Sequence, residues 1–279
     1  MICQDFPPAP PLRDFVKCYH LRHFVVSQAE KLPFKPYAPR PEQTLAFYPR
    51  GFESVEYVSS GIILQRPRSV IIGQPTERTN RHLAGSEFIV LLVNFQPGAL
   101  YRLTGIPSHE LNDSFVDAEA VFSSAISQVN ARLNSTGDYL EMIAIVEAFL
   151  IDLVKNNRHE SHPLDQVTDL LVRQPENARV LRLAEASFLS TRQFERRFRQ
   201  RTGVSPKLFA RISRLNKSVR MKYNRPDLDW LTIALQCGYN DYQHLAKDYK
   251  DLAGVLPTTY FLEETKAPET QFGMRDSSL

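Results

Sequence analysis

The densest group of functional side chains in this sequence is a run of arginines. Within R-Q-F-E-R-R-F-R-Q-R, residues 192–201, five of the ten residues are arginine. Guanidinium groups bind phosphates and carboxylates through paired hydrogen bonds, and they also match the acceptor edge of guanine. Because neighbouring arginines repel one another, such a run favours an anionic partner that relieves the repulsion. The chemistry that these residues suit is the binding of a polyanion.

The positive charge around this run is concentrated and is not spread along the chain. Between Thr191 and Arg225 there are twelve basic residues and one acidic residue, a net charge of +11, whereas the whole chain carries +3 and the remainder therefore −8. A basic block inside an otherwise acidic chain indicates nucleic acid as the polyanion. The simpler alternative is a solvated, charged helix face.

The run is expected to form a helix with one apolar side and one basic side. Ser190 is a candidate N-cap with Gln193 as its capping-box partner, and Gly203 marks the end. Phe194 and Phe198 are four residues apart, so both fall on one face of the helix. Burial of that face would leave the arginines pointing outward.

The same pattern recurs about fifty residues later and indicates two helix-turn-helix units, at about 180–206 and 230–257. The matched pairs are Phe194 and Leu245, Arg196 and Lys247, Phe198 and Tyr249, Gly203 and Gly254, and Pro206 and Pro257. In such a unit the second helix presents an outward polar face. Residues 208–223 between the units carry one apolar helical stripe, and a helix of that length spans about 24 Å. The spacing would place two recognition helices about one DNA turn, ~34 Å, apart.

At these motifs the sequence resembles the AraC/XylS family of bacterial transcription regulators. The matching segments are LAEASFLSTRQFERRFRQRTGVSP, KLFARISRL and IALQCGYNDYQHLAKDYKDLAGVLP, within roughly residues 165–262. The resemblance implies a sequence-specific DNA-binding transcription factor, an activator, whose variable N-terminal domain senses an effector or forms a dimer. One departure is Phe188 in the first turn, where the family usually has glycine, so the backbone there could differ.

The resemblance also implies which residues meet DNA. The base-reading positions are Arg192, Glu195 and Arg196 in the first unit and Tyr242, Gln243 and Lys247 in the second. The positions that contact the DNA backbone are Ser190, Arg197, Arg199, Arg201, Lys207 and His244. The chemistry agrees, because arginine suits guanine, glutamine suits adenine and glutamate accepts from cytosine.

Three alternatives accompany these assignments. Glu195 could instead pair with Arg199 on the helix surface. Tyr242 could pack against the linker helix. Residues 226–251 carry two lysines and five aspartates, a net −3, so the second unit is expected to hold DNA less tightly than the first.

The predicted fold class is α+β in two domains, because 279 residues exceed the usual size of one domain. Residues 1–155 are expected to form an N-terminal sensing or dimerisation domain, an antiparallel β barrel or sandwich that is cupin-like and has packed helices. Residues 156–163 form a linker. Residues 164–264 form the all-α DNA-binding domain, and residues 265–279 form a flexible tail.

The pattern of apolar segments and glycines predicts the elements of the first domain. Candidate strands cover 44–48, 55–58, 62–65, 70–72 and 88–95, and helices are expected near 12–19 and at 117–133 and 139–155. Asp138 is placed to cap the last helix. The apolar stripes of the two long helices could serve the core of the domain or a dimer interface.

Other kinds of chemistry have weaker support. Cys3, Cys18 and Cys237 are widely spaced and fit a reduced, cytoplasmic protein. His20 and His23 lack a metal-ligand pattern, so no metal or cofactor is expected. The longest apolar run, residues 88–93, is too short to cross a bilayer, and no membrane partner is expected. Arg66, Arg68, Arg78 and Arg81 could line a cavity for an acidic effector or lie exposed on loops.

The leading hypothesis is a transcription regulator whose partner is double-stranded DNA, and we expect no enzymatic activity. RNA polymerase and a second copy of the chain are further candidate partners, and the effector is unknown. The competing hypotheses are a barrel-domain enzyme, metal-dependent or for DNA repair, fused to a DNA-binding module, and an adaptor that has lost DNA binding.

Overall fold

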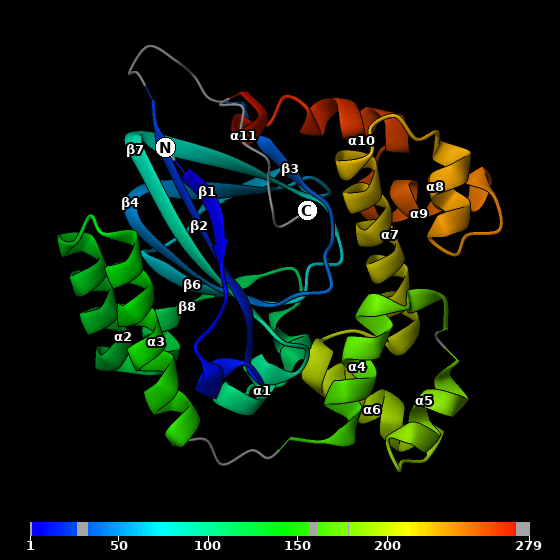
Figure 1. Ribbon diagram of the computed structural model, residues 1–279, viewed down its shortest axis with the longest axis horizontal. Helices are drawn as coiled ribbons and strands as arrows, with labels where there is room; N and C mark the ends of the chain where they lie inside the picture. Colours follow the sequence, from blue (N-terminus) through cyan, green and yellow to red (C-terminus); the bar gives the residue numbers. More distant parts are fainter. Residues whose placement is uncertain (1, 27–32, 157–160, 178, 272–279) are drawn as a thin grey trace.

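The computed structural model describes residues 2–26, 33–156, 161–177 and 179–271. A β-rich domain formed by the first half of the chain lies beside a helical domain formed by the second half (Figure 1). Within the described residues, no helix combines the length and the apolar character needed to cross a bilayer.

The β domain is one antiparallel sheet with helices on one side. Its strands are β1 Ile2–Phe6, β2 Val16–Val25, β3 Lys35–Tyr37, β4 Thr44–Tyr57, β5 Ile62–Gln65, β6 Ser69–Ile72, β7 Thr79–Phe95 and β8 Phe115–Asp117. Its helices are η1 Pro10–Leu12, α1 Ala99–Thr104, η2 Ser108–Leu111, α2 Ala118–Ser135 and α3 Tyr139–Lys155. The strand order is β1-β2-β7-β4-β6-β8, with β3 added to β7 and β5 added to β4.

The two faces of this sheet contribute side chains to two different cores, because successive side chains of a strand point to opposite faces. Leu91 and Val93 of β7 belong to the core that α2 and α3 cover. Val90 and Leu92 belong to a second core on the opposite face of the sheet. Register shifts near Arg50 in the pairing of β4 with β7 curve the sheet.

The predicted antiparallel β domain with packed helices is therefore confirmed, with local corrections. The predicted strands at 44–48 and 55–58 are parts of one long strand, β4. The helix predicted near 12–19 is wrong, because the chain forms the short turn η1 there and then enters β2. The long helices are confirmed as α2 and α3, and the Asp138 side chain accepts hydrogen bonds at the start of α3. Their apolar stripes are used in the core of the domain itself.

The helical domain begins after the linker. Its helices are α4 Pro163–Arg173, η3 Pro175–Asn177, α5 Val180–Ala186, α6 Thr191–Thr202, α7 Pro206–Asn224, α8 Trp230–Gln236, α9 Tyr242–Ala253, α10 Pro257–Glu264 and α11 Pro268–Gln271. Helix α7 has 19 residues, or about 28 Å at 1.5 Å per residue, and joins two separate cores. Phe194 and Phe198 lie in the first core, and Leu245 and Tyr249 lie in the second.

The end of the chain differs from the flexible tail expected over 265–279. Residues 268–271 form α11, and Glu269 is buried. In Figure 1 the helices α10 and α11 lie next to β3, at the edge of the β domain. Residues 272–279 are outside the described part of the chain. The last described residues therefore connect the helical domain back to the sheet.

Candidate nucleic-acid interface

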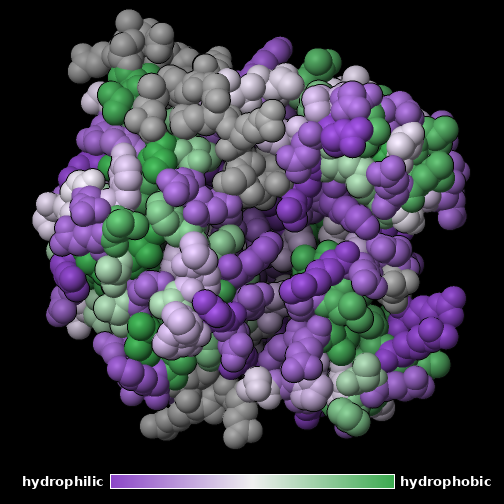
Figure 2. Space-filling model, in the orientation of Figure 1, coloured by the Kyte–Doolittle hydropathy of each residue, from purple (hydrophilic) through white to green (hydrophobic). Residues whose placement is uncertain are grey.

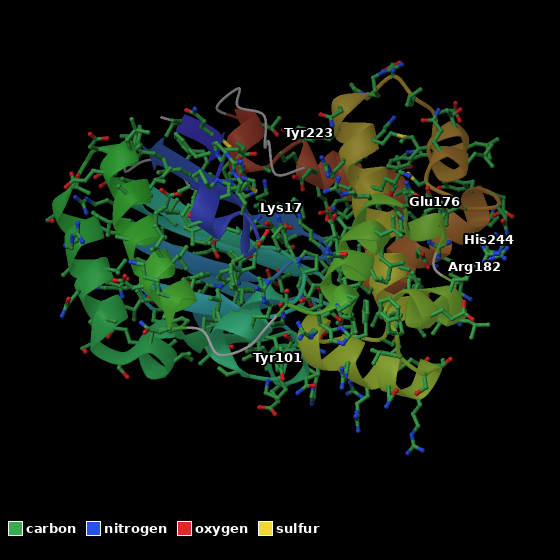
Figure 3. All side chains as sticks on the ribbon, turned by 60° about the horizontal axis from the view of Figure 1, so that its bottom comes forward. Lys17, Tyr101, Glu176, Arg182, Tyr223 and His244 are labelled. Atoms are coloured by element: carbon green, nitrogen blue, oxygen red, sulfur yellow. The ribbon has the colours of Figure 1, made fainter. Side chains whose placement is uncertain are left out.

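Helix α6 has the cap, the buried face and the exposed face that its sequence predicts. The Ser190 Oγ accepts from Gln193 N at 3.4 Å, and Gln193 Oε1 accepts from Ser190 N at 3.2 Å, which completes the capping box. Phe194 and Phe198 are fully buried. The exposed residues of α6 include Arg192, Glu195, Arg196 and Arg199. Figure 3 shows nitrogen-tipped side chains that project from this helix into open space.

No ion pair joins Glu195 to Arg199 within the part of the chain that the structure describes. Both side chains are exposed on the outer face of α6. Arg196 borders a groove whose other wall contains Tyr101 and His109 of the β domain. The N-terminal half of α6 is therefore open to solvent, whereas its other half approaches the β domain.

The C-terminal half of α6 is held by contacts inside the protein. Arg201 Nη1 donates to both oxygens of the Asp165 carboxylate of α4, at 2.7 and 2.8 Å, and the Arg201 side chain is only 11 % exposed. Gln200 Nε2 donates to Tyr101 Oη at 3.0 Å. In Figure 3, Tyr101 lies at the lower end of the β domain, on the side of α6. Arg201, expected at the DNA backbone, is engaged with Asp165 instead.

Arg197 is also directed toward α4 and is partly buried. Its Nη1 lies 3.0 Å from Nε2 of His162, the residue that caps α4. Burial lowers the pKa of His162, and the nearby Arg201 and Arg197 lower it further. A neutral imidazole next to two guanidiniums avoids an additional like charge. Arg197 therefore helps to join α6 to α4.

Gly203 ends α6 at a point of close approach to the β domain. Its φ is +94°, and a Cβ there would lie 2.2 Å from Asn112 Oδ1. Asn112 Nδ2 donates to the Gly203 carbonyl at 2.8 Å, and Ser108 Oγ donates to the Arg201 carbonyl at 2.8 Å. Gly203 thus fulfils the predicted role as helix stop and also allows the domains to touch.

The second unit repeats the geometry with different side chains. Asp241 caps α9 by accepting from His244 N at 2.9 Å. Gln243, His244 and Lys247 are exposed, and His244 lies in Figure 3 at the edge of the helical domain farthest from the β domain. Tyr242 is half-buried and packs against the core of the second unit, which matches the packing alternative.

Helix α7 places basic side chains next to the second unit. In the sequence these residues belong to the basic block at 191–225, which was counted with the first unit. Arg211 of α7 pairs with Asp248 at 2.8 Å and with Asp251 at 2.7 Å. The residues that line the groove between α7 and α9 include Lys207, Arg211, Arg214, His244 and Lys247. Two of the acids behind the net −3 of residues 226–251 therefore share one guanidinium, which offsets one of their two negative charges. Lys207 is predicted to contact the DNA backbone, whereas the sequence indicated no role for Arg211 or Arg214, although both belong to the basic block.

Another part of the basic block faces the β domain. A cleft of about 650 Å³ between the two domains is lined by Lys217 and Arg220 of α7 and by Lys17 of β2, among other residues. Figure 2 shows a hollow between the domains with mostly hydrophilic side chains around it. The +11 block is consequently divided between the outer surface and this cleft.

Cys237 is buried, and burial raises its pKa to about 11, so the thiol is not activated. His20 pairs with Asp5, and His23 Nδ1 lies 2.7 Å from Tyr139 Oη. Among the described residues, no group of three His, Cys, Asp or Glu side chains is arranged to hold a metal ion. The arginines Arg66, Arg78 and Arg81 are buried, and only Arg68 of that set is exposed.

Comparison with known proteins matches each domain separately. Residues 183–263 match the family described as a helix-turn-helix domain, and residues 4–117 match a domain of unknown function, DUF6597. ToxT from Vibrio cholerae is 10 % identical, with a TM-score of 0.48 over 88 % of this chain and 97 % of its own. The AraC-like transcriptional activator CuxR is 11 % identical, with a TM-score of 0.29 over 97 % and 83 %. No curated protein sequence matches this chain.

The two helix-turn-helix units, together with this family match, define the class of the protein. It is a helix-turn-helix DNA-binding transcription regulator, a class that acts by binding DNA and not by catalysing a reaction. Within that class the helix-turn-helix domain is of the AraC type, as the resemblance implied.

Proposed function

We propose that this chain is a sequence-specific regulator that reads two adjacent major-groove segments with α6 and α9. The main support for the proposal is that α6 and α9 each have one buried apolar face and one exposed polar face. Phe194 and Leu245 lie in the two cores, while Arg196 and Lys247 lie in the equivalent exposed positions. Helix α7 between them has a length comparable with the spacing of two neighbouring groove segments.

The proposed base-reading residues remain those with exposed side chains and suitable hydrogen-bonding groups. They are Arg192, Glu195 and Arg196 on α6, and Gln243 and Lys247 on α9, with Tyr242 at the edge. The proposed backbone contacts are Ser190, Arg199, Lys207 and His244, to which the α7–α9 groove adds Arg214. Arg197 and Arg201 act by holding α6 against α4, since both contact that helix.

The domain division forms part of the same proposal. Residues 1–155 form the sensing or dimerisation domain, 156–163 the linker and 164–264 the DNA-binding domain. Activation of transcription through RNA polymerase in the cytoplasm is inferred from the family resemblance. A homodimer would need a surface other than the apolar stripes of α2 and α3, because those stripes lie in the core of the β domain.

Selection of bound fragments from the genome of the source organism tests the proposal. The full chain is mixed with sheared genomic DNA, and the bound fragments are sequenced and aligned. We expect a recurring motif with two parts about one helical turn apart, and footprints over both parts. Uniform enrichment without a motif, or no binding to duplex DNA at low salt, would reject sequence-specific recognition. Transcription from a promoter with the motif, with and without the protein, distinguishes activation from repression.

A further inference from the structure

His162 lies at the point where the linker joins the helical domain, and its ring contacts two helices. The ring Nδ1 lies 3.1 Å from Leu164 N and accepts its N–H as the cap of α4. The ring Nε2 lies 3.0 Å from Arg197 Nη1 of α6. A backbone N–H and a guanidinium can only donate hydrogen bonds. Both ring nitrogens of His162 therefore face donors.

The protonation state of the ring decides which of these contacts can be a hydrogen bond. A neutral imidazole has one acceptor nitrogen, so it accepts from either Leu164 N or Arg197 and directs its own N–H at the other donor. An imidazolium has no acceptor and loses both hydrogen bonds. It also places a positive charge next to the Arg197 guanidinium, 3.0 Å away. A protonated ring is therefore incompatible with the present position of His162 between α4 and α6.

The charged groups around His162 are mostly positive. Arg197 and Arg201 approach it from α6. The Asp165 carboxylate of α4 is the nearby anion, but it already accepts two hydrogen bonds from Arg201 and one from His162 N. The cavity beside the ring has a volume of about 470 Å³, and the other charged residues that line it are Arg13, Asp14, Arg102, Asp169 and Arg173. Five arginines and three aspartates thus surround the ring, which disfavours a further positive charge there.

The pKa of His162 follows from these surroundings. Burial lowers this pKa, and Arg201 and Arg197 lower it further. The ring is therefore neutral near pH 7 and takes up a proton only below the ordinary histidine value of about 6.5. As the pH falls, the unfolded chain takes up this proton first. The stabilisation from neutral His162 is thus complete above about pH 6.5 and is lost as the pH falls through the lowered pKa of the folded chain.

Loss of the Arg197 contact affects one turn of α6 and not the whole helix. Arg201, one turn further along, keeps its pair with Asp165 at 2.7 Å when His162 is protonated. Arg196, the neighbour of Arg197 in the sequence, is exposed and is a proposed base-reading residue. The turn that His162 holds is therefore part of the helix surface that is proposed to face DNA.

We propose that His162 is a proton-sensitive positioning residue for α6. The neutral ring accepts from Leu164 N or from Arg197 and stays between the two helices. The protonated ring leaves this place, so that the first turn of α4 loses its cap and Arg197 moves into solvent. If the proposed function holds, acidification then weakens binding to the best DNA site, because α6 is held less firmly.

Titration of the His162 ring by NMR tests the site in the full chain. Its signals are assigned by their absence in His162→Asn. We expect a midpoint below about 6.5 in the unaltered chain and a higher midpoint in Arg197→Met, which removes a donor and a positive charge. Arg182→Met removes an exposed arginine of α5 and is the matched control, with an unchanged midpoint. A midpoint at or above the ordinary value in the unaltered chain, or equal midpoints in all three chains, would overturn the proposal.

Hydrogen exchange distinguishes a switch from a purely structural cap. In the unaltered chain, the protection of the amides of residues 164–168 should fall about fivefold from neutral pH to a pH below the midpoint, the factor that corresponds to the loss of one N-cap. The protection is corrected for the intrinsic effect of pH on exchange. His162→Asn keeps a good N-cap that does not titrate, so its protection should not change. No fall in the unaltered chain, or the same fall in both chains, would contradict the proposal.

Binding of the best duplex at both pH values connects the switch to α6. His162→Gln places an amide oxygen near the position of Nε2, where it can accept from Arg197 at either pH. Acidification should lower the affinity of the unaltered chain severalfold and that of His162→Gln less. Equal losses would overturn the link to α6. The ring titration and the amide exchange involve no DNA, so a chain that binds no DNA would reject the proposed function without changing their outcome.

Discussion

Phe188 and Gly238 occupy equivalent positions in the turns of the two helix-turn-helix units, and both have a left-handed backbone, with φ of +56° and +79°. The first turn therefore keeps the backbone conformation for which glycine is usual, although it carries a phenylalanine. The Phe188 side chain is 86 % exposed, so packing does not compensate for the unfavourable conformation. The phenylalanine is tolerated there because α5 and α6 are fixed by the core around Phe194 and Phe198.

Replacement of Phe188 by glycine should stabilise the protein. A left-handed residue with a Cβ costs roughly 1–2 kcal/mol, part of which is offset by the greater freedom of glycine in the unfolded chain. We expect a net gain of about 1 kcal/mol in the free energy of unfolding for Phe188→Gly, measured by denaturant titration. Phe188→Ala is the matched control, because alanine keeps the Cβ and should give no comparable gain. Equal stability of both variants would show that the turn is not strained.

Arg196 and Arg199 should affect DNA binding in different ways. Arg196→Ala removes a base contact, and we expect a loss of about 1–3 kcal/mol on the best site with weaker preference at one base pair. Arg199→Ala should weaken binding to all sequences alike and reduce the slope of affinity against salt by about one. Titration against specific and scrambled duplexes at several salt concentrations measures both effects. A change of sequence preference in Arg199→Ala would contradict this assignment.

The second unit should contribute less to affinity than the first. On α9 the exposed face carries Lys247 with His244 beside it, whereas α6 exposes Arg192, Arg196 and Arg199. Lys247→Ala should therefore cost less binding free energy than Arg196→Ala on the same duplex. The same titrations, with Lys250→Ala as a control for general loss of charge, decide the order. A larger loss for Lys247→Ala would mean that α9 is the main recognition helix.

Arg211 should support the second unit through its ion pairs. Arg211→Ala leaves the largely buried Asp248 carboxylate without its guanidinium partner, and such a loss costs roughly 1–3 kcal/mol of stability. Thermal unfolding measures the change. If the pair is the cause, adding Asp248→Asn to Arg211→Ala should recover part of the loss. A double variant that is less stable than Arg211→Ala would assign the effect to packing and not to charge.

The fragment of residues 163–264 should fold without the β domain and bind duplex DNA. Nearly all residues of the two helical cores lie within it, and Ala38 is the exception in the second core. Circular dichroism and sedimentation report its folding, and titration with duplex DNA at low salt reports binding. A helical, monodisperse fragment that does not bind would indicate that the β domain contributes to the DNA-binding surface.

The helical half of this chain could be predicted because its determinants are local. Ser190, Gln193 and Gly203 are within one helix length of the residues that they cap or terminate, and Phe194 and Phe198 define one face by their spacing. The β half was less predictable, because strand pairing joins distant segments. The helix predicted near 12–19 is wrong because residues 16–19 belong to the start of β2, which pairs with β1 and β7. These long-range pairings outweigh the local helical pattern.

The ion pairs that individual arginines form could not be predicted from their neighbours in the sequence. Arg201 belongs to the basic block by sequence, but the packing of α4 brings Asp165 to it from 36 residues away. Arg211 similarly reaches Asp248 and Asp251 across 37 and 40 residues. A net charge summed over a segment therefore predicted the electrostatics of each unit only in part.

The sequence alone determined the two helix-turn-helix units, their order and the exposed arginine face of α6, because caps, helical spacing and stops act within a few residues. Tertiary structure alone decided which cations remain available to DNA. It also placed Glu269 against Lys35, two residues from opposite ends of the chain. Ion pairs of this kind depend on how two separate domains pack, because Coulomb attraction is weak in water and becomes strong only where packing excludes water.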